Sequence, residues 1–291
     1  MPCNNPLIAY KDAVRGISFK HNAGGAQLRL PCGQCHGCRL DYSYMWATRI
    51  IHEAQMHDVN CFVTLTYREA PPTLIKRDVQ LFLKRLRKTH TPHTLRFYCA
   101  GEYGELTGRP HYHLCLFGID FPDRRHYKTT ALGHHLWTSA TLDKLWGHGM
   151  AVIGDLNAAT AAYTARYVMK KLKGRNTKER EIVNVDTGEI HKRANEFAHM
   201  SLRPAIGLEW LHKYYTDVYP HGYVISNGHK IKPPRYYEIK HADINPDEHE
   251  KLTYERYLRH RDNPQEDTPE RRHAKERILR AKLNLVPRSI E

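Results

Sequence analysis

Three short apolar segments, separated by polar and proline-containing stretches, are rich in β-branched and aromatic residues. They are CFVTLTY from Cys61, LRFYCAGEYG from Leu95 and HYHLCLFG from His111. Each has the length and composition that are typical of a β-strand. Pro71 and Pro72 interrupt the chain after the first segment. The pattern therefore predicts three strands.

Apolar residues recur at helical spacing in two segments next to these strands. Between about Leu40 and His57 they follow one another at steps of four and three, at Leu40, Tyr44, Ala47, Ile51 and Ala54. In DVQLFLKRLRK, from Asp78, basic residues separate an apolar stripe of Val79, Phe82, Leu83 and Leu86. We predict two amphipathic helices whose apolar side chains face inward.

Further elements are expected in the middle of the chain. A short helix and a short strand are predicted in SATLDKLW from Ser139 and GMAVIGDL from Gly149. A longer helix begins near Asn157, which can cap it, and runs through AATAAYTARYVMKKLK. Elements in this order indicate an α+β fold, a small antiparallel sheet with helices packed on one face.

The two ends of the chain differ from its middle. Residues 1–38 are rich in Gly, Pro and Asn and are expected to be loop-like, and RNTKEREIVNVDTGEIHKR beyond Gly174 is expected to form a hairpin or a mobile insertion. Thr268 and Pro269 can start a helix in the highly charged last fifty residues. We divide the chain into a cysteine-rich N-terminal segment with its helix (1–58), a central domain with an insertion near 174–200 (59–240), and a charged C-terminal tail, helical or mobile (241–291).

The basic side chains are concentrated in the first part of the chain. The formal net charge is +14, and residues 241–291 contain eleven Lys or Arg and eleven Asp or Glu, so the excess lies in the first 240 residues. A cationic body indicates a polyanionic partner, above all nucleic acid, although charge also aids solubility. Phosphate contacts are expected from the helix after Asp78, through Lys84, Arg85, Arg87 and Lys88.

The sequence indicates a protein that works in a cytosol. Its apolar runs are short and interrupted, and MPCNNPLIAYKD lacks the basic stretch and apolar core of a signal peptide, so no membrane association is expected. A reducing compartment disfavours a disulfide framework. The seven cysteines are therefore interpreted as buried thiols, metal ligands or both.

A cysteine cluster near the N-terminus has the spacing of a metal site. CGQCHGC separates Cys32, Cys35 and Cys38 by three residues each, and Cys3 can be a fourth thiolate, with His36 as an alternative ligand. Four such ligands are typical of structural zinc, Zn²⁺, and the other interpretation is a set of reduced, partly buried thiols. The cysteines inside predicted strands are expected in the core: Cys61, Cys99 and Cys115.

Two histidines lie one residue apart in the third predicted strand. Side chains alternate between the faces of a strand, so His111 and His113 project together while Tyr112 points away. Two imidazoles need one further donor to hold a divalent ion with open coordination sites. Glu102, at the end of the strand before, can supply it, and Glu105 in the turn is the competitor. The alternative is a hydrogen-bonded histidine pair without a metal.

Two tyrosines lie four residues apart in the helix after Asn157. This spacing places Tyr163 and Tyr167 on one helix face, with their Cβ atoms roughly 5–6 Å apart. A phenol becomes a usable nucleophile when a bound cation and nearby basic groups favour its deprotonation, and Lys170 and Lys171 follow closely. Packing against a core is the other interpretation of tyrosines at this spacing.

The chain resembles a known family in these segments. VTLTY, HYH and YTARYVMKK are similar to the three ordered motifs of HUH endonucleases, the rolling-circle replication initiators, in the class with two tyrosines. The resemblance extends over most of the chain up to about Tyr237. There, MPCNNPL, PCGQCHGCRL, GEYGELTGRPHYH, SLRPAIG and KIKPPRY are similar to the replication initiators of microviruses, the gokushovirus-like small single-stranded DNA phages. It implies an HUH, or Rep-like, endonuclease core.

The resemblance also implies a reaction. A tyrosine attacks the origin phosphodiester of double-stranded replicative-form DNA, which leaves a 5′-phosphotyrosyl link and a free 3′-OH that a polymerase extends. The second tyrosine cleaves the regenerated origin, and strand transfer releases a circular single-stranded genome. By this resemblance Tyr163 and Tyr167 are nucleophiles, and His111, His113 and Glu102 hold Mg²⁺ or Mn²⁺. The implied partners are origin DNA, single-stranded and replicative, with host helicase and polymerase in the cytoplasm of a bacterial cell.

Other classes of protein share some of these features. Plasmid-type relaxases and single-strand transposases use the same chemistry. A non-catalytic zinc-containing nucleic-acid-binding protein would explain the charge and the cysteine cluster, but not HYH and the tyrosine pair. The cysteine cluster and the breadth of the resemblance favour the phage initiator.

Overall fold

The structure is a computed structural model of the chain. It describes residues 3–12, 16–20, 25–90, 94–104, 107–170, 180–183, 188–226, 228–262 and 267–285. The chain divides into two compact units. The first combines Met1–Tyr42 with Glu250–Arg288, and the second consists mainly of Ser43–His249.

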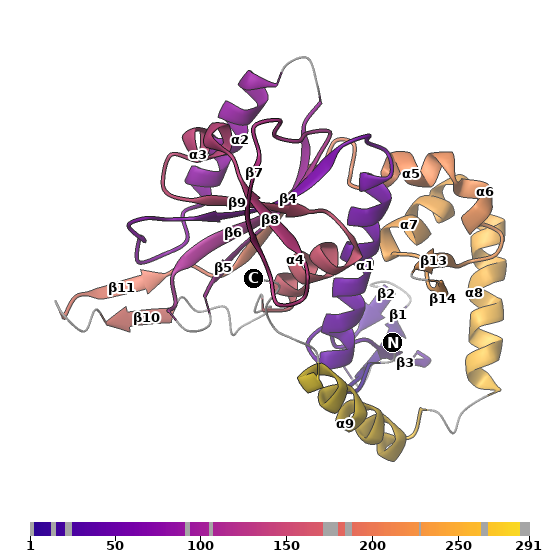
Figure 1. The fold of residues 1–291 in the computed structure, drawn as a ribbon. Helices are drawn as coiled ribbons and strands as arrows, with labels where there is room; N and C mark the ends of the chain where they lie inside the picture. The colour runs from indigo at the N-terminus through magenta and orange to yellow at the C-terminus, as the bar shows by residue number, and fades with distance from the viewer. Residues whose placement is uncertain are drawn as a thin grey trace. The chain divides into compact units, whose positions relative to one another are not determined.

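A seven-stranded sheet forms the centre of the second unit (Figure 1). Its strands are β4 (Asn60–Thr66), β5 (Arg96–Tyr103), β6 (Pro110–Phe117), β7 (Arg125–Thr129), β8 (His135–Thr138), β9 (Ala151–Asp155) and β12 (Phe197–Met200). They lie in the order β12-β5-β6-β4-β9-β8-β7, and neighbours are antiparallel. The three predicted strands are the adjacent strands β5, β6 and β4, and the predicted α+β class is confirmed.

Helices cover both faces of this sheet, not one face as predicted (Figure 1). On one face, α2 (Lys76–Thr89) and α3 (Ala140–Trp146) bury their apolar side chains against the odd-numbered residues of β4. On the other face lie α1 (His36–Ala54) and α4 (Ala158–Lys170). There, the Trp46 and Tyr98 rings are 5.2 Å apart, and the Cys115 thiol lies 3.6 Å from the Thr164 hydroxyl. The strands are therefore apolar on both faces.

The start of α4 is fixed by the cap predicted from the sequence. The side-chain oxygen of Asn157 accepts from the backbone N–H of Thr160 at 3.0 Å, and the Thr160 hydroxyl accepts from the N–H of Asn157 at 2.9 Å. This reciprocal pair satisfies N–H groups that the first turn of a helix leaves without partners. It sets the point at which the chain turns from β9 into α4.

The second unit contains further elements, some of which the sequence did not reveal. The predicted hairpin is present in the described residues as β10 (Arg180–Val183) paired with β11 (Ile190–Arg193). The strands β7, β8 and β12 of the large sheet were not predicted. The same holds for α5 (Leu208–Lys213), α6 (Tyr215–Val218), β13 (Val224–Ser226), β14 (His229–Ile231) and α7 (Arg235–Ile244). The helix α8 (Pro246–Arg261) links this unit to the first.

The first unit contains a small sheet where the sequence analysis expected loops. Its strands β1 (Leu7–Asp12), β2 (Gly16–Ser18) and β3 (Gln27–Leu30) lie in the order β2-β1-β3 and are antiparallel. These strands are short and largely exposed, and the Gly, Pro and Asn residues around them are typical of loops, so the strands were not predicted. The predicted C-terminal helix is α9 (Pro269–Leu285), and the Thr268 hydroxyl accepts from the N–H of Arg271 at 3.2 Å.

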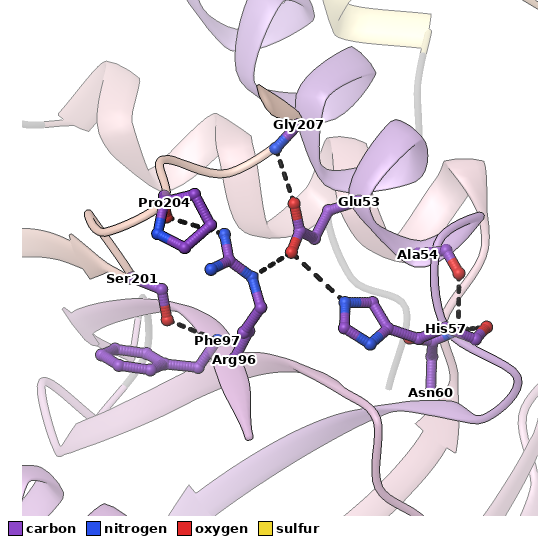
Figure 2. A network of polar contacts seen from close by, with 9 residues as sticks. All are labelled: Glu53, Ala54, His57, Asn60, Arg96, Phe97, Ser201, Pro204 and Gly207. Atoms are coloured by element: carbon purple, nitrogen blue, oxygen red, sulfur yellow. Dashed lines mark hydrogen bonds and ion pairs between the residues drawn. The ribbon is translucent and has the colours of Figure 1, made fainter. Parts of the chain in front are cut away.

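A buried ion pair joins α1 to the first residue of β5 (Figure 2). Oε1 of Glu53 accepts from Nε of Arg96 and lies 3.3 Å from Nε2 of His57, while Oε2 accepts from the N–H of Gly207 at 2.6 Å. Arg96 also donates to the carbonyl of Pro204 at 2.8 Å. Burial alone would raise the pKa of Glu53, but the hydrogen bonds and the charge of Arg96 outweigh it and lower that pKa. The pair therefore holds helix, strand and the loop before α5 together.

Replacing Glu53 by glutamine should destabilise the second unit by about 3–5 kcal/mol, because Arg96 would remain buried without its counter-charge. The measurement is the free energy of unfolding in urea. Glu209→Gln, at an exposed position of α5, is the control and should change this free energy little. Equal unfolding curves for the two variants would show that the buried pair does not stabilise the unit.

Candidate functional site

The antiparallel register of β5 and β6 brings three predicted ligands together. Glu102 lies directly opposite His111, and His113 follows two residues along the same face of β6. Oε1 of Glu102 lies 2.7 Å from Nε2 of His111 and 3.1 Å from Nε2 of His113. One donor atom from each residue lies within 4.8 Å of the other two, so one cation could contact all three.

Neighbouring groups orient both imidazole rings. Nδ1 of His111 lies 3.2 Å from the carbonyl of Arg109, and Nδ1 of His113 lies 3.0 Å from the hydroxyl of Thr64. A carbonyl only accepts, so Nδ1 of His111 carries a proton, and a neutral ring then directs the lone pair of Nε2 at Glu102. Nε2 of His111 and the carboxylate of Glu102 would then both be acceptors, so their contact needs a positive charge between them, either a second proton on the ring or a bound cation. The donor set therefore fits a divalent metal whose ligands are held by outer hydrogen bonds.

Thr64 is a site residue that the sequence analysis missed. Its side chain is buried on β4, which pairs with β6 so that Thr64 lies opposite His113. The available signal was the polar residue in the otherwise apolar strand CFVTLTY. Its proximity to a histidine 49 residues away depends on strand pairing.

The carboxylate of Glu102 is ionised at neutral pH. Burial would raise its pKa, but the contacts with His111 and His113 outweigh burial and lower the pKa to about 2. Glu102 is 3% exposed and His113 is fully buried, whereas His111 is partly exposed. The site is thus open to solvent on the side of His111. Two imidazoles and one carboxylate leave coordination positions for a substrate oxygen.

The helix α4 places Tyr163 beside this cluster. The Tyr163 ring centroid lies 5.1 Å from that of His113, and the two rings are nearly perpendicular at 81°. Phe62 stacks on His113 at 5.6 Å and contacts Tyr163 edge-on at 6.3 Å. Tyr163 is 7% exposed, so its ring does pack in the core as the alternative interpretation held. The packing also brings the phenol close to the candidate metal site.

Four of the residues singled out in the sequence are only partly described or are not described. Tyr167 and Lys170 lie on α4, but their side chains are outside the described part of the structure. Lys171 and Glu105 lie outside the described residues altogether. The backbone of α4 does place Tyr167 one turn after Tyr163, which is the spacing that the sequence predicts.

The basic face of α2 is smaller than predicted. Arg85 is half-buried, and its guanidinium donates to the carbonyls of Leu145 at 2.7 Å and Trp146 at 3.0 Å. These carbonyls belong to the last turn of α3, where a helix leaves its acceptors without partners. Arg85 therefore caps α3, and its guanidinium is less available for phosphate contacts. The other three residues of the predicted set are exposed: Lys84, Arg87 and Lys88.

The cysteine cluster lies in the first unit. The four sulfur atoms of Cys3, Cys32, Cys35 and Cys38 lie within 4.8 Å of one another. Backbone N–H groups point at the sulfurs: Asn4 and Cys38 donate to Cys35 at 3.3 and 3.4 Å, and Cys32 donates to Cys3 at 3.2 Å. Burial would raise the pKa of Cys35, but the N–H groups of Cys38 and Asn4 and the side chains of Cys38 and Cys32 lower it to about 7. The cluster fits a tetrahedral ion that binds thiolates.

Two other expectations about this region can be compared with the structure. His36 lies outside the four-sulfur cluster, with Nδ1 3.6 Å from a carboxylate oxygen of Glu276. The cysteines of the strands are fully buried core residues, as expected: Cys61, Cys99 and Cys115.

No helix within the described ranges combines the length and the apolar character that a membrane crossing requires.

Comparison with known proteins identifies relatives of this chain. The family model for replication-associated protein ORF2/G2P matches residues 60–172, which include β4 to α4 and so every residue of the Glu102, His111, His113 and Tyr163 cluster. Replication-associated protein VP4 of Bdellovibrio phage phiMH2K is 33% identical over 261 residues, 85% of this chain and 79% of the relative. No solved structure matches.

Two further relatives have similar descriptions. Replication-associated protein ORF2 of Spiroplasma virus 4 is 32% identical over 209 residues, 63% of this chain and 65% of the relative. Replication-associated protein ORF4 of Chlamydia phage 1 is 27% identical over 220 residues, 72% of this chain and about half, 52%, of the relative. These matches confirm the resemblance to microvirus replication initiators that the motifs carry. The chain therefore belongs to the family of phage replication-associated proteins.

Proposed function

We propose that this protein is an HUH-type endonuclease that initiates rolling-circle replication by nicking the origin of phage replicative-form DNA. The observation that supports the proposal most directly is the convergence of Glu102, His111 and His113 with Tyr163 on one face of the sheet. A polar, partly open cluster of this kind beside a phenol suits phosphoryl transfer. We assign the activity to the central domain, residues 59–240.

The reaction is a transfer of the origin phosphate to a tyrosine. The phenolic oxygen of Tyr163 or Tyr167 loses its proton and attacks phosphorus. The bond from phosphorus to the 3′ oxygen breaks, and this oxygen takes up a proton to become a free 3′-OH. The 5′ end stays on the protein as a phosphotyrosine. A second attack from the other tyrosine cleaves the regenerated origin and frees a new 3′-OH. This 3′-OH attacks the phosphorus of the first phosphotyrosine, the bond from phosphorus to the tyrosine oxygen breaks, the phenol takes up a proton, and a circular single strand is closed.

The other residues of the site prepare this transfer. Mg²⁺ or Mn²⁺ held by Glu102, His111 and His113 would polarise the scissile phosphate. Thr64 and the carbonyl of Arg109 keep the imidazole rings oriented. Glu102 contributes a buried negative charge that favours a cation over a neutral ligand.

DNA binding is assigned to the basic surfaces of the chain. Lys84, Arg87 and Lys88 are exposed on α2 and can contact phosphates without base specificity. Lys170 and Lys171, near the tyrosines in sequence, are proposed to do the same. Arg85 is left out because its guanidinium caps α3. The proposed partners are origin DNA with host helicase and polymerase, in the cytoplasm of the bacterial host.

Metal-dependent formation of a covalent adduct tests the proposal. The wild-type protein, incubated with a labelled single-stranded origin oligonucleotide and Mn²⁺, should form a labelled protein band. EDTA should remove this band, and so should His113→Ala, which deletes one ligand, whereas oligonucleotide affinity should stay within about threefold of wild type because phosphate contacts supply it. Adduct formation that is equal in EDTA or in His113→Ala would rule out the metal site.

A further inference from the structure

Two tyrosines next to the metal-site residues point to the opposite face of the sheet. Tyr103 follows Glu102 on β5, and Tyr112 lies between His111 and His113 on β6. Because side chains alternate along a strand, both rings face α2 and not the candidate metal. Both hydroxyls are hydrogen-bonded to the same loop, residues 73–75, which leads into α2.

The hydroxyl of Tyr112 contacts both the backbone N–H and the backbone carbonyl of one loop residue, Ile75. The N–H of Ile75 donates to its hydroxyl oxygen at 2.9 Å, and the hydroxyl lies 3.0 Å from the carbonyl of Ile75 and can donate to it. The hydroxyl of Tyr67 lies 3.0 Å away and itself donates to Asp78, in the first turn of α2, at 2.7 Å. Tyr112 is fully buried, so these contacts are shielded from water.

Tyr103 makes a second attachment to this loop. The N–H of Leu74 donates to its hydroxyl oxygen at 3.1 Å, and the Thr73 hydroxyl lies 3.2 Å away. The Tyr103 hydroxyl in turn donates to the carbonyl of Ala194 at 2.8 Å. The loop is therefore attached to β5 and to β6 at positions adjacent to the proposed ligands.

The Tyr112 ring occupies space that is open because the residue opposite it on β5 is a glycine. Gly101 is the β5 residue paired with Tyr112, and a Cβ there would lie 3.1 Å from Cδ1 of Tyr112 and 2.7 Å from a ring carbon of Phe197. The ring thus packs directly over the strand that carries Glu102. Rotation of β6 about its own axis, which would swing His111 and His113 away from Glu102, would have to displace this ring and break its hydrogen bonds to Ile75.

We propose that Tyr112, supported by Tyr103, is a positioning residue that holds His111, His113 and Glu102 in ligand geometry by fixing both strands to the 73–75 loop. This inference rests on the proposed metal site. Metal ligands must stay within about 0.2 Å of their preferred distances, and groups that orient a ligand commonly contribute a factor of about 10–100 to metal affinity. The Tyr112 hydroxyl bonds to Ile75 and would act on the ligands through the backbone of β6. Tyr112 does not contact the substrate in this role.

The test is the Mn²⁺ affinity of the DNA-free protein, measured by calorimetry. Tyr112→Phe keeps the ring and removes the hydroxyl, and its dissociation constant for Mn²⁺ should rise about 10-fold or more. In the adduct assay, the Mn²⁺ concentration for half-maximal rate should rise by the same factor, and saturating Mn²⁺ should restore most of the rate. Tyr103→Phe should act in the same direction and provides the test if Tyr112→Phe does not fold.

The matched control is Tyr237→Phe. Tyr237 is also fully buried in this unit, and its hydroxyl lies 3.0 Å from Nδ1 of His52, away from the 73–75 loop. This variant should bind Mn²⁺ like the wild type. If Tyr112→Phe and Tyr103→Phe also bind like the wild type, the positioning role is overturned while the metal site stands. If the wild-type protein itself binds no Mn²⁺, the proposed metal site fails and the inference fails with it.

Discussion

Replacing both Tyr163 and Tyr167 by phenylalanine should abolish the covalent protein–DNA adduct, with a loss of rate of roughly 10⁴-fold or more, the scale expected when a nucleophile is removed. The change deletes only the attacking oxygens. The ring of residue 163 would still pack against Phe62 and His113, so stability should change little. The measurement is adduct formation on a single-stranded origin oligonucleotide, with thermal unfolding as the check on folding.

The single variants separate the two roles of the tyrosines. Tyr163→Phe and Tyr167→Phe should each retain some cleavage through the remaining hydroxyl. Circularised product should fall sharply in both, because the second cleavage occurs while the first 5′ end is still bound. Mass spectrometry of the adduct identifies the attacking residue. A double variant that still nicks, or an adduct on Tyr103 or Tyr112, would refute the assignment.

Loss of zinc should unfold the first unit, because a structural Zn²⁺ bound by thiolates contributes about 10–16 kcal/mol of apparent binding free energy to folding. We expect one zinc per chain in protein purified under reducing conditions, held by Cys3, Cys32, Cys35 and Cys38. Cys35→Ser should lose the metal and make the segment before α1 sensitive to protease. Elemental analysis and limited proteolysis measure the two effects.

His36→Ala is the matched control for this prediction. His36 is next to Cys35 in sequence, but its ring faces Glu276, so the variant should keep its zinc and its resistance to protease. Loss of zinc in His36→Ala would instead identify the imidazole of His36 as a zinc ligand. Protein without stoichiometric zinc under reducing conditions would instead identify the cluster as reduced thiols.

Local patterns in the sequence were sufficient for the elements that carry the site. The apolar stripe of α2 is buried as predicted, at Val79, Phe82, Leu83 and Leu86. The alternation in HYHLCLFG correctly placed His111 and His113 on one face, and Asn157 caps α4 as expected. These features depend on spacing within one helix or strand, or on a turn between adjacent strands. Neighbours of this kind are fixed by backbone geometry.

Short and exposed elements were not visible in the same way. The strands β1, β2 and β3 were not predicted, because the strands are short and largely exposed and the Gly, Pro and Asn residues around them indicated loops. That helices cover both faces of the large sheet was also not predicted, because it depends on the face on which α1 and α4 pack. A sequence pattern indicates that one face of a strand or helix is apolar, but it does not indicate which other element packs on that face.

By itself, the sequence determined local relations: that the two histidines share a strand face, that the two tyrosines share a helix face, and that the cysteines have the spacing of a metal site. Only the tertiary structure decided which of these meet. It placed Thr64 behind His113 and brought Tyr163 against the same imidazole. It also directed the guanidinium of Arg85, on α2, to the carbonyls at the end of α3, to which it donates hydrogen bonds. Each of these contacts joins residues about 50 or more positions apart, and their proximity results from strand pairing and helix packing, which the order of residues within one segment does not contain.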